Sequence, residues 1–140
     1  MRLWKLSAVF ALLAATPATA QGDAAAGEAA FRQCVACHVV TTPTGDTLAG
    51  RAGRSGPNLY GVAGGPAGAV DGFRYSGGLE ALKNAAVVWT EDNFVAYVQD
   101  PSDFVRQATG NGAARSSMSF RVRNETDARD LYAYLVQLAQ

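Results

Sequence analysis

Apolar side chains recur at the spacing of one α-helical face near both ends of this 140-residue chain. Each stripe has four positions: Gly27, Ala30, Phe31 and Cys34 in the first, and Leu131, Tyr134, Leu135 and Leu138 in the second. The second stripe follows Asn124, a residue type that caps helices, and acidic residues that favour a helix N-terminus. The pattern predicts a helix in each segment.

Two more helices are predicted in the middle of the chain. Thr90 is a good N-cap, and Trp89 and Phe94 stand where a hydrophobic staple would close. We expect this helix to end before Pro101, because proline blocks helix continuation. A weaker, shorter helix is predicted over residues 78–84.

The remaining segments have the composition of loops. Residues 39–73 contain nine glycines and three prolines, and residues 101–117 show no useful period. No strand alternation of convincing length is present in the sequence. Loops of this length are uncommon in a compact domain unless they serve a function. We therefore expect that something beyond the polypeptide itself organises these two loop segments.

Residues 1–20 are typical of a secretory signal peptide. Arg2 and Lys5 precede an apolar run over residues 6–15, and small residues lead to Ala20. The run is about half the roughly twenty residues needed to cross a bilayer. We expect cleavage after Ala20, which would leave residues 21–140 as a single soluble domain exported to the periplasm.

The charges of the chain argue against nucleic-acid binding, and their distribution along the sequence allows two interpretations. Beyond residue 20, ten basic side chains oppose twelve acidic ones, a formal net charge of −2 that argues against a nucleic-acid binder. Residues 51–76 and 104–123 are rich in arginine, whereas the stretch between them is acidic. This pattern is either ordinary solvated surface or two basic loops that share a face and steer an acidic partner.

The sequence Cys34-Val35-Ala36-Cys37-His38 carries the strongest chemical signal. It uses both cysteines and the only histidine of the chain. Cysteines three residues apart, with histidine next, lie on one side of a helical turn. Two such thiols can add to the vinyl groups of a haem, and the imidazole can then reach the iron. The motif predicts one covalently bound haem c.

Three other interpretations of this motif compete. A disulfide or thioredoxin-like redox pair is possible after export, but the βαβ pattern that accompanies such pairs is missing from the sequence. A structural zinc site needs four ligands, and no further cysteine or histidine exists. The third interpretation is that the motif occurs by chance.

Met118 is the candidate for the second axial ligand of the iron. It is the only methionine apart from Met1, and no second histidine exists. A lone methionine commonly fills a core. Met118, however, lies in the polar sequence Ser116-Ser117-Met118-Ser119, which favours ligation. A thioether ligand raises the reduction potential and suits electron transfer.

Several motifs in order give the chain a resemblance to the class I c-type cytochromes. It is similar to the soluble bacterial cytochromes of the c-two type and to mitochondrial cytochrome c over residues 22–139. The matching blocks are Gly27 with Phe31, the attachment motif, Gly56-Pro57-Asn58-Leu59-Tyr60-Gly61, Phe73-Arg74-Tyr75, Trp89 and Tyr97 before Asp100-Pro101, Met118-Ser119-Phe120, and residues 130–135.

The resemblance implies an all-α fold, with three main helices and long loops wrapped around one haem. Gly27 would let the terminal helices cross closely, with Phe31 packed against Leu131 and Tyr134. Residue roles are implied for the haem pocket as well, where the carbonyl of Pro57 would accept a hydrogen bond from the ring of His38.

The resemblance also implies roles for three aromatic residues. Tyr75 and the indole N–H of Trp89 would hydrogen-bond a haem propionate, and the Tyr97 hydroxyl would point at the Met118 sulfur. The alternative for each is ordinary core packing with its polar tip in water. With His38 and Met118 both on the iron, substrates could not reach it, so the chain would be an electron carrier and not an enzyme.

The implied partners are redox proteins: a quinol:cytochrome c oxidoreductase, a terminal oxidase or reductase, or a photosynthetic reaction centre. A dedicated cytochrome subunit of a periplasmic dehydrogenase and an open-site haem enzyme or gas-binding protein are the alternatives. The chain departs from the family at its charged surface. Lys83 is the only lysine beyond residue 20, whereas the family commonly surrounds the haem edge with lysines.

Overall fold

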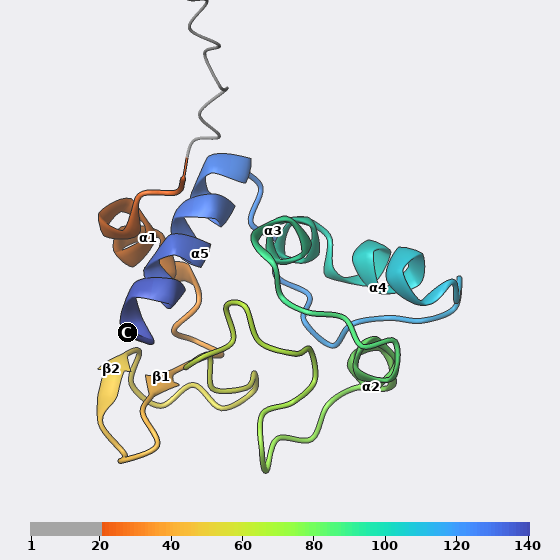
Figure 1. Cartoon of the computed structure of the whole chain (residues 1–140), viewed down its shortest axis with the longest axis horizontal. Coiled ribbons are helices and arrows are strands. Elements are labelled where there is room, and N and C mark those ends of the chain that lie inside the picture. Colours follow the sequence, from red (N-terminus) through yellow and green to blue (C-terminus); the bar gives the residue numbers. More distant parts are fainter. Residues whose placement is uncertain (1–20) are drawn as a thin grey trace, which may run out of the picture.

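The computed structural model describes residues 21–140, so the predicted signal peptide and its cleavage site lie outside the described residues (Figure 1). Its elements, in chain order, are α1 (Ala24–Ala30), a 3-10 turn η1 (Phe31–Gln33), β1 (Val40–Thr41), β2 (Thr47–Ala49), α2 (Gly77–Asn84), α3 (Glu91–Gln99), α4 (Pro101–Thr109) and α5 (Glu125–Leu138). Within residues 21–140, no helix is both long and apolar enough to cross a membrane.

Local sequence signals set the start of the helices that they predict. The Thr90 side chain accepts a hydrogen bond from the backbone of Asn93 and caps α3, and the Asn124 side chain accepts one from Thr126 and caps α5. Helix α2 begins one residue earlier than predicted, at Gly77. The predicted helices are therefore confirmed.

Helix α4 corrects one prediction. Residues 101–109 are helical instead of loop, so the described residues contain five α-helices within the expected all-α fold. Pro101 does end α3, but it also occupies the first position of α4, where its fixed φ suits the helix and its missing N–H is not needed. The Asp100 carboxylate accepts the backbone N–H of Asp103 at 3.1 Å and caps the new helix.

The glycine-rich segment after η1 is mostly loop, as predicted, with one small exception. Strands β1 and β2 pair antiparallel, with Val40 opposite Ala49. They contain two and three residues, which is too short for alternation to be visible in the sequence.

The two terminal helices cross in close contact, as the resemblance implies (Figure 1). A Cβ atom on Gly27 would overlap the backbone carbonyl of Asp130 in α5, so only glycine allows this approach. The ring of Phe31 lies 5.7 Å from that of Tyr134, centroid to centroid, and Leu131 belongs to the same buried cluster. The predicted packing of α1 on α5 is confirmed.

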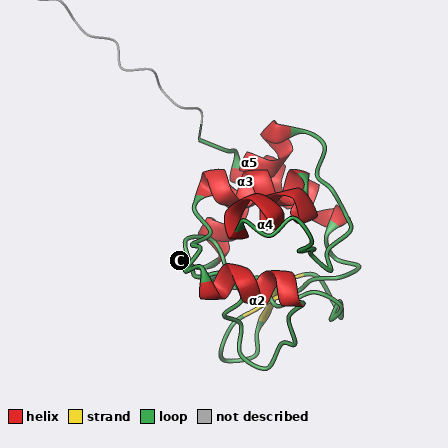
Figure 2. Ribbon diagram, turned by 90° about the vertical axis from the view of Figure 1, so that its right-hand side faces the viewer, coloured by secondary structure: helices red, strands yellow, loops and turns green. Residues whose placement is uncertain are grey.

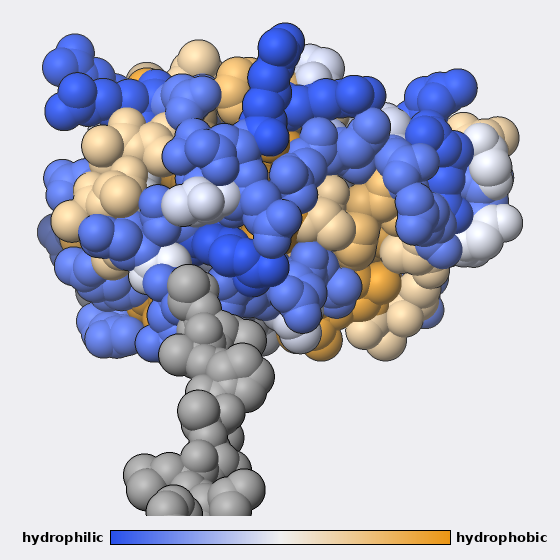
Figure 3. Space-filling view, turned by 90° about the horizontal axis from the view of Figure 1, so that it is seen from above, coloured by the Kyte–Doolittle hydropathy of each residue, from blue (hydrophilic) through white to orange (hydrophobic). Residues whose placement is uncertain are grey.

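The buried side chains form two clusters. One joins η1, α3 and α5 around Phe31, Phe94 and Leu131, and the other joins α2 and α4 around Leu82, Trp89 and Val105. Figure 2 shows α2 below α4 in this view, with α3 and α5 further above. The face shown in Figure 3 is mostly hydrophilic, with smaller apolar areas among the polar side chains.

Helix α2 ends in a turn that carries local strain. Ala86 has φ 54°, a left-handed conformation that costs a residue with a Cβ atom about 1–2 kcal/mol. The amide of Ala86 bonds to Lys83 and that of Val87 to Leu82, which is the Schellman arrangement that usually contains glycine.

We predict that Ala86→Gly raises the free energy of unfolding by about 0.5–1 kcal/mol, because relief of strain exceeds the added entropy of the unfolded chain. Ala85→Gly is the matched control: Ala85 has φ −79°, so glycine there should lower stability. Denaturant titration of both variants checks this, and equal destabilisation by the two would contradict it.

Candidate functional site

One cavity of about 440 Å³ brings the predicted site residues together. It lies between the helices and the long loops, and its size falls within the roughly 300–1,000 Å³ of small-molecule sites. All eight residues predicted from the sequence line it: Cys34, Cys37, His38, Pro57, Tyr75, Trp89, Tyr97 and Met118. Most of the remaining lining is apolar, with Phe94 and Leu131 among its walls.

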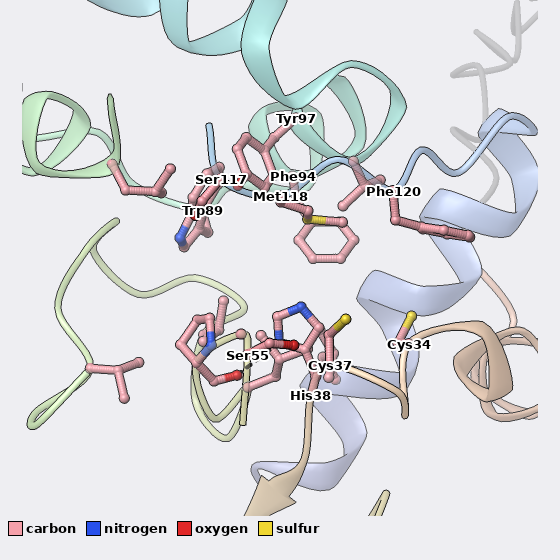
Figure 4. A pocket seen from close by; sticks show the side chains of 18 of the residues that line it. Cys34, Cys37, His38, Ser55, Trp89, Phe94, Tyr97, Ser117, Met118 and Phe120 are labelled. Carbon is pink, nitrogen blue, oxygen red and sulfur yellow. Dashed lines mark hydrogen bonds between the residues drawn. The ribbon is translucent and has the colours of Figure 1, made fainter. Parts of the chain in front are cut away.

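The attachment motif forms a tight turn at one wall of the cavity. The amides of Cys37 and His38 both bond to the Cys34 carbonyl, at 3.1 and 2.9 Å. This turn places both sulfur atoms and the imidazole on the same side, facing the cavity (Figure 4). Gly53 packs against the turn so closely that a Cβ atom there would lie 2.7 Å from the backbone nitrogen of His38.

The Cys34 thiol does not have the lowered pKa of a redox-active cysteine. Burial, and secondarily the neighbouring Cys37, raises the pKa of Cys34 to about 11, whereas redox-active thiols have a lowered pKa. Cys34 and Cys37 are not joined to each other. Residues 21–140 also contain no cluster of three or more His, Cys, Asp or Glu side chains that could hold a metal, which removes support for a zinc site.

The imidazole of His38 is held in one orientation. Its Nδ1–H donates to the carbonyl of Pro57 at 2.8 Å, which leaves the other ring nitrogen directed into the cavity (Figure 4). Burial lowers the pKa of His38, although the hydrogen bond to Pro57 acts in the opposite direction. The imidazole is therefore kept neutral, the form in which histidine binds metals. Gly56 lies directly against the ring, where a Cβ atom would overlap it.

Asn58 has a structural role that the sequence did not reveal. Its side-chain oxygen accepts the amide of Thr41 at 2.9 Å, and its side-chain nitrogen donates to the Thr41 carbonyl at 2.7 Å. These bonds fix the Pro57 loop to β1. The motif block indicated that Asn58 matters, but only the fold shows its partner.

Met118 lies on the opposite side of the cavity from His38. Its sulfur and the imidazole face each other across the space between the two walls (Figure 4). The segment that carries Met118 is a loop between α4 and α5, and the Val122 amide ties it to the Val98 carbonyl of α3 at 2.8 Å.

Tyr97 has a different partner from the one that the resemblance implies. Its hydroxyl lies 2.7 Å from the Ser116 hydroxyl, and the structure has no hydrogen bond from Tyr97 to the sulfur of Met118 within residues 21–140. Burial raises the pKa of Tyr97, so the phenol remains protonated at neutral pH. No sequence signal pointed to Ser116, because a single serine in a polar loop is unremarkable.

Tyr75 and Trp89 offer hydrogen-bond donors to the cavity. The Tyr75 oxygen accepts the amide of Val70 at 3.1 Å, which leaves its own O–H free to donate. The indole nitrogen of Trp89 points into the cavity (Figure 4). Next to Tyr75, the buried hydroxyl of Ser76 has no partner within the described chain. Tyr75 and Trp89 thus bring two polar hydrogens to the lining of the cavity, where they could stabilise a carboxylate.

The donor set fits a haem. Two thiols and a neutral imidazole share one wall, a thioether faces them, and the walls between are apolar. Donors suited to carboxylates lie beside this cavity, from Tyr75 and Trp89. His38 and Met118 could hold the iron, and Cys34 and Cys37 could form the thioethers.

Comparison with known proteins gives a consistent result. No protein-family model matches the chain. Cytochrome c2 of Rhodovulum adriaticum is 52% identical over 84% of this chain and 93% of its own. Cytochrome c2 of Cereibacter sphaeroides is 44% identical over 96% of this chain and 94% of its own. The crystal structure of cytochrome c2 from Rhodobacter sphaeroides superimposes with a TM-score of 0.82 at 44% identity, and covers 84% of this chain and 97% of its own.

The all-α fold, the site and these relatives agree, and the chain belongs to the class I c-type cytochromes of the c2 type.

Proposed function

We propose that this cytochrome is a one-electron carrier of the periplasm, with one haem c attached through Cys34 and Cys37 and axial ligands from His38 and Met118. The observation that carries the proposal is the opposition of the His38 imidazole and the Met118 sulfur across one apolar cavity (Figure 4). Residues 21–140 would be the exported domain, and residues 1–20 its signal peptide.

When bound, the haem supplies an iron centre that exchanges one electron reversibly. His38 contributes a neutral nitrogen, and the Pro57 carbonyl fixes the ring and increases its basicity. Met118 would contribute a thioether, a ligand type that favours the ferrous state. With His38 and Met118 both holding the iron, the protein would exclude other ligands and leave electron exchange as the chemistry.

The chain would also stabilise the haem carboxylates with its own hydrogen-bond donors. The free O–H of Tyr75 and the indole N–H of Trp89 are positioned to donate to a propionate. Such donors compensate for the cost of keeping a carboxylate away from water. Both rings also contribute to packing, since Trp89 is buried in the α2–α4 cluster and Tyr75 packs against it.

Electrons would pass through an exposed edge near Cys37 and Phe120. Cys37 is exposed, and Phe120 retains 43% of its surface, although it lines the cavity. A small exposed patch of this kind suits a weak, transient redox interface. The proposed partners are a quinol:cytochrome c oxidoreductase on one side and a terminal oxidase, reductase or photosynthetic reaction centre on the other.

Arginines would steer this encounter in place of lysines. The backbone of Arg115, in the second basic segment, lies against Gly78 of α2, two residues beyond the end of the first basic segment at residue 76. Arg115 has no carboxylate partner among the described residues, whereas Arg121 lies 3.2 Å from Asp100. Arg115 therefore presents the less compensated charge.

We predict that Met118→Ala keeps the haem attached but lowers the reduction potential by on the order of 0.1 V, because a thioether ligand is lost. The reduced variant should also bind carbon monoxide rapidly, whereas the reduced wild type should not. Potentiometry and carbon monoxide titration check both effects. Rapid stoichiometric carbon monoxide binding by the wild type would favour an open-site haem protein, and an unchanged potential would exclude Met118 as the ligand.

We predict that the double variant Arg115→Glu, Arg121→Glu slows electron transfer to the partner complex about tenfold at low salt, by weakening association. The effect should shrink at high ionic strength, and Arg115→Glu alone should contribute more than Arg121→Glu. Second-order rate constants with native membranes test this, with the double lysine variant as the charge-preserving control. Equal rates at low salt would remove the steering role.

A further inference from the structure

The loop that carries Met118 has few attachments for a segment that must hold a ligand in place. Between the end of α4 and the start of α5, residues 110–124 contain no helix or strand. Apart from Asn111, whose amide bonds to the adjacent Thr109 hydroxyl at the end of α4, the loop amides that bond to α3 or α4 are those of Val122, to the Val98 carbonyl at 2.8 Å, and Ser116, to the Ser102 hydroxyl at 3.2 Å. Met118 lies between these two points.

Ser116 connects Met118 to the helical frame through one oxygen atom. The Met118 amide donates to the Ser116 Oγ at 3.1 Å, and the same oxygen lies 2.7 Å from the Tyr97 hydroxyl. A hydroxyl can make both bonds at once, because it has one hydrogen and two lone pairs. The Ser116 side chain thus bridges the methionine backbone and α3.

The anchor at the other end of this bridge is rigid. The ring of Tyr97 lies 4.8 Å from Trp89 and 5.9 Å from Phe104, centroid to centroid. Ser102, which holds the Ser116 amide, is in the first turn of α4. Helices α3 and α4 therefore each contribute one hydrogen bond to Ser116.

We propose that Ser116 is a positioning residue for Met118, and that Tyr97 acts on the ligand through the Ser116 hydroxyl instead of through a bond to the sulfur. This inference rests on the proposed role of Met118 as an axial ligand. In this proposal, the hydrogen bond from the Met118 backbone N–H to the Ser116 Oγ holds the ligand in position.

The test uses imidazole as a competing ligand for the iron of the haem-loaded, full-length mature protein. Ser116→Ala removes the bridge and should raise the affinity for imidazole about tenfold, the effect of losing roughly one hydrogen bond. Ser116→Thr keeps the hydroxyl and should stay within about twofold of wild type. Amide hydrogen exchange at Met118 gives a second readout and should accelerate in Ser116→Ala alone.

A double-mutant cycle separates the two routes from Tyr97 to Met118. If Tyr97 acts through Ser116, Tyr97→Phe should raise imidazole affinity in the wild-type background but add little in the Ser116→Ala background. If Tyr97 donates to the sulfur directly, its effect should persist in both backgrounds, and this result would overturn the proposal.

Failure of this inference is distinguishable from failure of the ligand assignment. Unchanged imidazole affinity and unchanged Met118 exchange in Ser116→Ala would overturn the role of Ser116 while Met118 still ligates. If Met118→Ala has the same imidazole affinity as wild type, the ligand assignment itself is wrong, and the inference falls with it.

Discussion

The apolar cavity between His38 and Met118 is the constraint on which this fold depends. Both hydrophobic clusters border this cavity, and Tyr97 packs against both of them at its wall. A large planar group attached to the chain would complete the core.

The same constraint explains why long loops are ordered around the site. The glycine-rich segment is held where it meets the site: Asn58 ties it to β1, Gly53 and Gly56 pack on the attachment turn, and Pro57 bonds to His38. On the opposite wall the Met118 loop is tied to α3 and α4. His38 and Met118 are therefore each fixed by contacts beyond their own element, which would limit their movement if they hold an iron that changes charge.

Sequence patterns predicted the parts of this structure that local chemistry determines. The caps at Thr90 and Asn124, the close crossing at Gly27 and the attachment turn all depend on residues near each other in sequence or on a known motif. Helix α4 is not predictable in this way, because Pro101 signals the end of α3 and gives no separate sign that it also starts the next helix. The hydroxyl contact between Tyr97 and Ser116 and the ion pair between Arg121 and Asp100 join positions about twenty residues apart without any periodic signal, so only the fold could reveal them.

The intact mass of the purified exported protein shows whether a haem is covalently attached in this cavity. Under denaturing conditions, we expect the mass of the processed chain plus one haem, with no thiol available to an alkylating reagent. A folded, colourless protein with the mass of the polypeptide alone and two reactive thiols would contradict it.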